Sequence, residues 1–414
     1  MPSIAIVVNA FPRLSESFIA NKVRFLANAG YRVTVIVHDL RADRAERSWP
    51  DGLRIKVAPS AYRLAWRLVR VAAAWMRAPG EMTRLWRALA GVDLGERARL
   101  TAMYAPFAGE HFDVTHFAFS GLGVAYQPVL FFLKKKSKLY VSCRGHAEQI
   151  RPLSDPARRA ALERLFATVD RVHCVSDDML NTCRGYGLSP DKAFVNRPAI
   201  DPALFCVGAG KEQGCARERG KGMRIASVGR LHWKKGQDTL LQALQILAQR
   251  GIDAQLDIAG EGPEREKLLF VAHLLGLSGR VRFRGALSQA DVRQLLAEAD
   301  IYAHASLSEG ISNAVMEAMA MELPVVSTEA GGMRELIAHG RDGLLVPPLN
   351  PGALADALQA LYKDPDLRSR LGGAARQTIL RDFTLDRQRS VYADEYAQAL
   401  AHTPRPDPSP PPMP

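Results

Sequence analysis

The sequence predicts an α/β protein made of two doubly wound domains, each built on a parallel sheet. Short apolar runs of strand type alternate with longer helical segments in both halves of the chain, which is the pattern of repeated strand–helix–strand units. Between the halves, residues 207–222 are polar and glycine-rich and have no hydrophobic period, as expected of a linker. We therefore expect a first domain over 1–206 and a second over 223–384.

The first half opens with an apolar strand, a loop, a helix and a second strand. The loop offers Ser15 as a helix cap, with Glu16 in the first turn of the helix. A strand, a helix and a strand of these lengths favour a parallel pair joined by a helical crossover. The strands expected in this half are 3–9, 31–37, 112–119, 139–143 and 172–175.

Candidate site residues follow two of these strands. Ligands on open parallel sheets bind at the carboxyl ends of the strands. This rule selects Arg13, Ser15 and Glu16 after the first strand, and Arg144 and His146 after the 139–143 strand. A plain capped loop and a hydrogen-bonded structural histidine account for the same residues about equally well.

The second half repeats the alternation of strands and helices. Pro263 is expected to open a helix, because proline is favoured at the first helical position. The last helix, 385–401, precedes a proline-rich tail, 403–414, which cannot form a packed core and is expected to be disordered. The strands expected in this half are 223–228, 254–259, 281–283, 300–303, 324–327 and 343–346.

Composition narrows the class of protein. The 414 residues are 47% hydrophobic and 24% charged, as in soluble globular proteins, and the net charge of +12 favours acidic partners such as nucleotides, phosphates or anionic lipid. No nucleic-acid-binding signature accompanies this charge, so nucleic acid is not expected as a partner. The five cysteines form no Cys-x-x-Cys pair, the chain starts with a strand rather than a signal peptide, and no apolar run approaches the ~18 residues of a membrane span. We expect a cytoplasmic protein.

A basic amphipathic helix is expected within residues 61–78, before the break at Pro79-Gly80. Such a helix can lie on an anionic membrane surface, or its apolar side can pack on the core of the protein. We expect the apolar side to pack on the core, while the arginine side can still attract lipid headgroups. The arginine side carries Arg63, Arg67, Arg70 and Arg77, and the opposite side carries Leu64, Leu68, Val71, Ala72 and Trp75.

The segment 308–317 carries two glutamates eight residues apart. Glu309 lies just before an expected helix, and Glu317 lies inside it among residues that are almost wholly apolar. A carboxylate in such a helix needs a polar partner, because an unpaired buried charge is costly. The helix start offers unpaired N–H groups and the positive end of the helix dipole, which favour an anion. The pattern suits a ligand with polar groups at both ends and an anion between them.

Several loops of the second half should meet near this segment. They carry Arg230 and Lys235, the glycines of 260–263, and the glycine pair 331–332. Two cations, glycines that allow close backbone approach, and a helix N-terminus describe a diphosphate site. Because carboxylates accept hydrogen bonds from sugar hydroxyls, the expected ligand is a nucleotide-sugar. No Gly-x-x-x-x-Gly-Lys-Ser/Thr segment occurs, so an ATP-hydrolysing P-loop is not supported.

At these residues the chain resembles the retaining glycosyltransferases of family 4, which have the two-domain GT-B fold. The resemblance covers nearly all of 223–346, and the segment 11–19 is also similar to the subgroup that builds exopolysaccharides and colanic-acid-like polymers. Ser312 stands where proline is common, and Pro198-Ala199-Ile200-Asp201 replaces a frequent Asn-Gly-Val-Asp. The matching residues are Val228-Gly229-Arg230-Leu231, Lys235-Gly236, Gly260-Glu261-Gly262-Pro263, Glu309-Gly310, Glu317-Ala318-Met319-Ala320, Pro324-Val325-Val326-Ser327-Thr328, Gly331-Gly332 and Glu335.

The resemblance implies a role for each candidate. Glu309 would hold the donor sugar and His146 would contact that sugar near the reacting carbon, so these two are the catalytic candidates. Glu317 would bind the ribose hydroxyls. The diphosphate would meet Arg230, Lys235, Gly310, Ile311, Ser312 and Asn313, the nucleotide loop would be Gly260, Glu261 and Gly262, and the acceptor side would include Arg13, Ser15, Glu16 and Arg144.

The implied reaction is transfer of a sugar, with retention, from a nucleotide-sugar to a glycan or a polyprenyl-linked acceptor in polysaccharide synthesis. Neither a metal nor another cofactor is then expected. The resemblance also implies that the last helix, 385–401, completes the first domain, and that the enzyme is cytoplasmic or peripheral on the inner face of the membrane. A nucleotide-sugar epimerase of the same fold and a catalytically silent nucleotide-sugar-binding protein are the alternatives.

Overall fold

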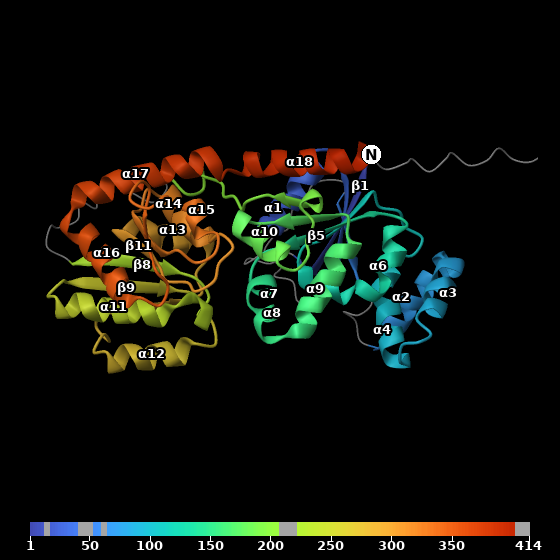
Figure 1. Cartoon of the computed structure of the whole chain (residues 1–414), viewed down its shortest axis with the longest axis horizontal. Coiled ribbons are helices and arrows are strands. Elements are labelled where there is room, and N and C mark those ends of the chain that lie inside the picture. Colours follow the sequence, from blue (N-terminus) through green and yellow to red (C-terminus); the bar gives the residue numbers. More distant parts are fainter. Residues whose placement is uncertain (12–16, 40–52, 59–63, 207–221, 402–414) are drawn as a thin grey trace, which may run out of the picture. The chain divides into compact units, whose positions relative to one another are not determined.

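The computed structural model describes residues 1–11, 17–39, 53–58, 64–206 and 222–401. The predictions for Arg13, Ser15, Glu16 and Arg63 lie outside these residues, as do the tail 403–414 and the linker up to residue 221. Figure 1 shows the chain as two α/β bodies, each with its own sheet flanked by helices. One unit comprises 1–174, 180–196 and the chain from 389 onward, and the other comprises 175–179 and 197–388. The predicted fold class, two doubly wound parallel-sheet domains, is confirmed.

The first unit contains a seven-stranded parallel sheet in the order β3-β2-β1-β4-β5-β6-β7. Strand β1 is an interior strand, and its residue Ile4 is paired with Val33 on one side and Val114 on the other. The sequence does not predict the edge strands β3 and β7, because strands of four and three residues carry little apolar pattern. The strands are β1 (Ser3–Ala10), β2 (Arg32–Asp39), β3 (Arg54–Val57), β4 (Val114–Phe117), β5 (Lys138–Cys143), β6 (Arg171–Cys174) and β7 (Ala193–Val195).

Helices connect these strands in the first unit. Proline is the first residue of α3 and α9 and the second of α8, positions where the missing N–H costs no hydrogen bond. The helices are α1 (Ser17–Asn28), α2 (Leu64–Arg77), α3 (Pro79–Ala88), α4 (Leu94–Tyr104), α5 (Ser120–Ala125), α6 (Gln127–Lys134), α7 (His146–Gln149), α8 (Arg151–Ser154), α9 (Pro156–Thr168) and α10 (Asp177–Arg184), with short 3-10 turns η3 (Ala105–Phe107) and η4 (Pro190–Lys192).

Helix α2 buries only part of the side that the sequence predicts, with Val71 and Trp75 half-buried. The expectation that its apolar side packs on the core is wrong for Leu68, which is 62% exposed, and for Ala72, which is also exposed. The small residue Ala74 is buried instead. The side of the helix that carries Ala74 faces inward, and at the C-terminal end the aliphatic part of the Arg77 side chain lies against Gly109. An apolar strip therefore remains on the surface.

The last helix, α18 (Leu385–Ala401), packs its second half on the sheet of the first unit. Tyr392 and Tyr396 are buried there, and the Tyr396 hydroxyl lies 2.7 Å from Nδ1 of His116 on β4. Arg171 on β6 forms an ion pair of 2.6 Å with Glu395. The red helix in Figure 1 is thus tied to strands that come far earlier in the chain.

The second unit contains a six-stranded parallel sheet in the order β10-β9-β8-β11-β12-β13. Every strand expected in this half is present. The strands are β8 (Met223–Val228), β9 (Ala254–Ala259), β10 (Val281–Gly285), β11 (Ile301–His304), β12 (Val325–Thr328) and β13 (Leu344–Val346). The helices are α11 (Gln237–Gln249), α12 (Arg265–Leu274), α13 (Gln289–Glu298), α14 (Asn313–Ala320), α15 (Met333–Leu336), α16 (Pro351–Lys363) and α17 (Pro365–Asp382), with a 3-10 turn η5 (Trp233–Lys235).

Packing on both faces makes this sheet the centre of the second unit. Along β11, Ile301 and Ala303 join one hydrophobic cluster, whereas Tyr302 joins the cluster on the other face. Pro263 does not open a helix as predicted: it lies in a turn in which the Arg265 N–H donates to the Gly262 carbonyl at 3.2 Å, and α12 begins at Arg265. Strands β8 and β11 lie side by side although they are far apart in the chain. A crevice at their carboxyl ends is the usual ligand position in such sheets.

We predict that Tyr396 stabilises the first unit. Truncating a buried aromatic side chain leaves a cavity, so Tyr396→Ala should lower the free energy of unfolding by about 3–5 kcal/mol. Tyr396→Phe removes only the contact with His116 and should cost about 1 kcal/mol. Chemical denaturation measures both values. The half-exposed Tyr362, as Tyr362→Phe, is the matched control; similar losses at the two positions would contradict the prediction.

Candidate nucleotide-sugar site

Two loops of the second unit approach each other so closely that their glycines have no room for a side chain. A Cβ on Gly260, whose φ is +142°, would lie 1.9 Å from the Gly229 carbonyl oxygen. A Cβ on Gly262 would lie 2.1 Å from the carbonyl oxygen of Leu231, whose N–H donates to the Glu261 carbonyl at 2.9 Å. The expected meeting of these loops is present, and glycine is what permits it.

The loop after β11 is fixed in the same way. Gly236 adopts a left-handed conformation, and a Cβ there would meet the Ala305 carbonyl oxygen at 2.1 Å. On the other side, a Cβ on Gly332 would lie 2.1 Å from the Gly310 carbonyl oxygen. The N–H of Leu307 donates to the Lys234 carbonyl at 2.7 Å. The 305–310 loop is therefore held between the segment before α11 and the glycine pair 331–332.

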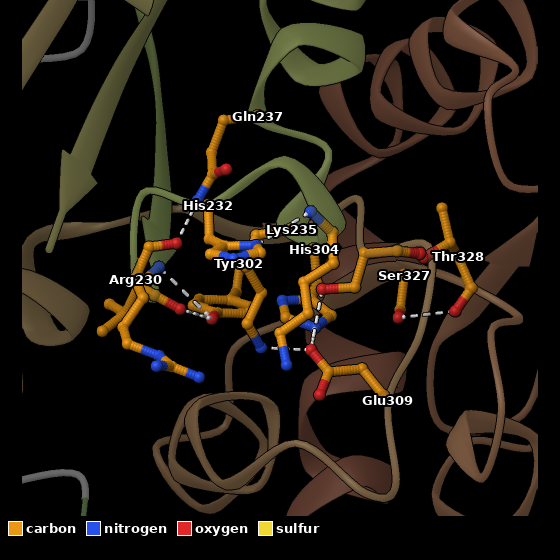
Figure 2. Close-up of polar contacts among 12 residues, drawn as sticks. Arg230, His232, Lys235, Gln237, Tyr302, His304, Glu309, Ser327 and Thr328 are labelled. Atoms are coloured by element: carbon orange, nitrogen blue, oxygen red, sulfur yellow. Dashed lines mark hydrogen bonds and ion pairs between the residues drawn. The ribbon is translucent and has the colours of Figure 1, made fainter. Parts of the chain in front are cut away.

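Glu309 lies in this loop and gathers donors from three directions. Lys235 and His304 both point toward its carboxylate in Figure 2. The ammonium of Lys235 forms an ion pair with Oε1, Nε2 of His304 lies 3.0 Å from it, and the Ser306 hydroxyl donates to it at 2.7 Å. Only 11% of the Glu309 side chain is exposed. A nearly enclosed carboxylate is thus held in one orientation.

The protonation states of this cluster follow from its surroundings. Burial alone would raise the pKa of Glu309, but the Lys235 ammonium and the His304 hydrogen bond hold that pKa well below its usual range. Burial lowers the pKa of His304 more than the neighbouring Glu309 raises it. At neutral pH the carboxylate is therefore ionised and the imidazole is neutral, so His304 donates its Nε2–H to Glu309.

Glu317 lies in a different environment, one turn into α14. Its side chain retains some exposed area, while its carboxyl group is deeply enclosed. No hydrogen bond or ion pair joins this carboxyl group to any residue that the structure describes, and burial raises its pKa to about 7. A carboxylate of this kind can accept hydrogen bonds from a ligand without first giving up a protein partner.

Cationic and backbone donors are available between the two glutamates. The exposed guanidinium of Arg230 makes no hydrogen bond or ion pair with the described part of the chain. Helix α14 starts after Ser312, and no side chain caps its first turn or places an acid there. Unpaired N–H groups at a helix start attract anions. The 312–317 segment therefore offers an anion position followed by a carboxylate.

The remaining predicted residues lie in the first unit or outside the described ranges. His146 opens α7 directly after Gly145, whose φ of +152° favours glycine. The buried Glu148 carboxylate accepts the N–H groups of Arg144 and Gly145 at 3.2 and 3.0 Å, which fixes this turn. The guanidinium of Arg144 lies 4.0 Å from the Phe18 ring. All of these residues belong to the first unit.

The sequence assigns no role to three further candidate residues. His304 and Ser306 contact Glu309, and the only signal for them was their position at the end of a buried strand. Glu335 belongs to the motif that carries the resemblance, but the sequence gives it no role. Its carboxylate accepts the N–H groups of Asp177 and Asp178 and pairs with Arg197 at 2.9 Å, and all of these residues belong to the second unit. In the described ranges, no three His, Cys, Asp or Glu side chains gather as metal ligands would.

The two glutamates should affect the stability of the ligand-free protein in opposite ways. The raised pKa of Glu317 means that its charge destabilises the fold as the pH rises from about 4.5 to about 7. Glu317→Gln should therefore raise the thermal midpoint at pH 8, and the gain should fade toward pH 5. The depressed pKa of Glu309 contributes stability that is present above pH 4.5 and lost at lower pH, so Glu309→Gln should lower the midpoint at pH 8.

Thermal unfolding between pH 4.5 and 8.5 tests both signs. Glu266→Gln on the surface of α12 is the control for losing one charge. If Glu309→Gln and Glu317→Gln changed the thermal midpoint at pH 8 in the same direction, the assigned environments would be contradicted.

Comparison with known proteins independently supports the resemblance to glycosyltransferases. Residues 15–204 match the family model described as Glycosyltransferase Family 4, and residues 215–378 match the model described as Glycosyl transferases group 1. The amylovoran biosynthesis glycosyltransferase AmsK of Erwinia amylovora is 30% identical over 85% of this chain and 88% of its own. WcaL of Salmonella typhimurium, provisionally named as a colanic acid biosynthesis glycosyltransferase, is 27% identical over 90% of this chain and 94% of its own.

The fold is also similar to that of solved structures. Anabaena HepE, crystallised in complex with UDP-glucose, superimposes with a TM-score of 0.71 at 17% identity, covering 96% of this chain and 99% of its own. Together with the two family matches and the AmsK relationship, this fold defines the family. The chain belongs to glycosyltransferase family 4 and is an enzyme of the GT-B fold.

Proposed function

We propose that this enzyme transfers a sugar, with retention, from a nucleotide-sugar to a glycan or lipid-linked acceptor in exopolysaccharide synthesis. The observation that carries the proposal is the pair of carboxylates on either side of an open helix start, Glu309 held by Lys235 and Glu317 without a described partner. The names of AmsK and WcaL support an exopolysaccharide product. The complex of HepE with UDP-glucose supports a uridine donor as the first candidate.

Each end of the donor finds matching chemistry. Glu317 accepts hydrogen bonds from the ribose hydroxyls, which makes the charged form of this carboxyl group favourable again. The diphosphate lies between the start of α14 and the cations Arg230 and Lys235, because both offer positive potential. Glu309 accepts hydrogen bonds from the donor sugar. Gly260 and Gly262 let their loop pack on the 229–231 segment, which fixes the loop beside which the nucleotide is placed.

The proposed chemistry requires charge stabilisation at the leaving group. The bond from the sugar carbon to the diphosphate oxygen breaks as an acceptor oxygen attacks from the same face, and the acceptor proton passes to the departing phosphate. Arg230 and Lys235 stabilise the negative charge that develops on that phosphate. His146, whose role rests on the family resemblance, contacts the sugar near the reacting carbon.

Substitutions at Glu309 and Glu317 should impair different kinetic properties of the enzyme. Glu309→Gln should lower kcat by about 100-fold or more with little change in donor affinity, because a positioned charge at the reacting sugar is lost. Glu317→Gln should weaken donor binding by about 10-fold and change kcat less, because it removes ribose contacts. The assay first screens labelled nucleotide-sugars for consumption, starting with UDP-glucose, and then measures kinetics with the donor that is consumed.

Glu266→Gln is again the control and should keep the kinetics of the unmodified enzyme. Undiminished kcat in Glu309→Gln would reject the assigned role. Conversion of the donor to another free nucleotide-sugar, with no glycoside formed, would identify an epimerase instead of a transferase.

The surface of α2 supports attachment to an anionic membrane as part of this function. No helix among the described residues is long and apolar enough to span a bilayer. On α2, however, Leu68, Val69 and Met76 are 57–80% exposed and lie next to the exposed Arg70 and Arg77. An exposed apolar strip edged by arginines suits the interface of an anionic bilayer. Attachment there would bring the enzyme to the membrane that carries a lipid-linked acceptor.

Vesicle sedimentation tests this attachment. Replacing Arg63, Arg67 and Arg70 by Gln should weaken binding to vesicles containing phosphatidylglycerol, and so should Leu68→Gln with Met76→Gln. High salt should weaken binding of the unmodified protein, because the attraction is partly electrostatic. Leu269→Gln with Phe270→Gln on α12 is the matched control for exposed apolar residues. Equal binding by all variants, insensitive to salt, would rule out this face.

A further inference from the structure

We propose that His304 and Ser306 are positioning residues that keep Glu309 in place for the donor sugar while Lys235 divides its hydrogen bonds between Glu309 and the diphosphate. This inference rests on the proposed role of Glu309 in donor binding. It assigns a function to two side chains that touch neither phosphate nor sugar in the proposed mechanism.

The three donors to Glu309 differ in how firmly they are held. His304 ends β11 and is 3% exposed, and its ring stacks on Tyr302 at 6.3 Å between centroids with an angle of 20°. Ser306 is fully buried, and its carbonyl accepts the Thr328 hydroxyl of β12 at 2.6 Å. Two of the three contacts therefore come from groups fixed to neighbouring strands.

Lys235 is the adaptable member of the cluster. It lies in a 3-10 turn, and 15% of its side chain is exposed. An ammonium group has three N–H donors on a flexible stem, so it can reach a phosphate and a carboxylate together. A phosphate that shares the ammonium weakens its attraction to Glu309, because one positive charge then serves two anions. His304 and Ser306 then supply the contacts that remain.

Neutral hydrogen-bond donors are suited to holding the Glu309 carboxylate in place. The Lys235 and Glu309 charges balance, whereas a charged imidazole would add a second cation beside Lys235. Among the described residues, the ionisable groups that act on His304 are Glu309 in the next loop and Lys235 in the η5 turn, while Tyr302 stacks on it from the same strand and in turn faces Glu317 on α14. Burial and Lys235 favour the neutral imidazole, and a neutral N–H can hold the carboxylate without neutralising it.

The test compares three substitutions. His304→Phe keeps the ring shape and removes the N–H, His304→Gln supplies an amide N–H in its place, and Ser306→Ala removes the hydroxyl. We expect kcat to fall about 10-fold in His304→Phe and about 3- to 10-fold in Ser306→Ala, and to be partly restored in His304→Gln. Affinity for the nucleoside diphosphate alone should change less than about 2-fold, because that probe carries no sugar. The acid limb of the kcat–pH profile should move to higher pH in His304→Phe, because Glu309 is then protonated more easily.

Stability against pH gives a readout that needs no substrate. Glu309 should lose its stabilising effect at a higher pH in His304→Phe than in the unmodified protein, and the difference should disappear in the Glu309→Gln background. An unchanged kcat and acid limb in His304→Phe would overturn the inference, as would equal losses of kcat and thermal stability in the Phe and Gln variants. Failure of the proposed function looks different, because the unmodified protein would then consume no donor at all.

Discussion

Close contact between backbones is the constraint on which the candidate site depends. Gly229 with Gly260, Leu231 with Gly262, and Gly310 with Gly332 meet at distances that exclude a Cβ atom. Each contact joins loops that follow different strands of one sheet. The loops are therefore positioned by the packed sheet itself and not by flexible side chains, and the functional side chains extend from a rigid base.

On this base the protein treats two similar carboxylates in opposite ways. Glu309 receives a cation and two neutral donors, so its charge is stable before any ligand arrives. Glu317 is enclosed and has no described partner, so its charge is costly in the free protein. The first arrangement suits a group whose orientation has to be ready in advance. The second suits a group that gains its hydrogen-bond partners only from the ligand. Until the ligand binds, the unpaired buried charge lowers the stability of the free protein.

The sequence predicts most of the fold and the loops of the site, but few of the contacts. Strands such as β8 and β9 can be predicted because a short apolar run that ends at a glycine is typical of a buried parallel strand. The four-residue β3 escapes because it has too little pattern. His304 could not be predicted as a partner of Glu309, because that contact depends on how a strand end and a loop fold together. The orientation of α2 could not be predicted either, since it depends on contacts with residues far along the chain, such as that of Arg77 with Gly109.

Under the proposed function, a carboxyl group with a pKa of about 7 also couples the binding of a nucleotide-sugar to the release of a proton. In the free enzyme near neutral pH, a large share of molecules carries the proton on Glu317. A ligand that donates hydroxyl hydrogen bonds favours the carboxylate, so its binding releases protons to the buffer, by the general linkage between protonation and binding. Part of the apparent binding enthalpy is then the ionisation heat of the buffer. Under the proposed role of Glu317, donor occupancy becomes a function of pH as well as of donor concentration.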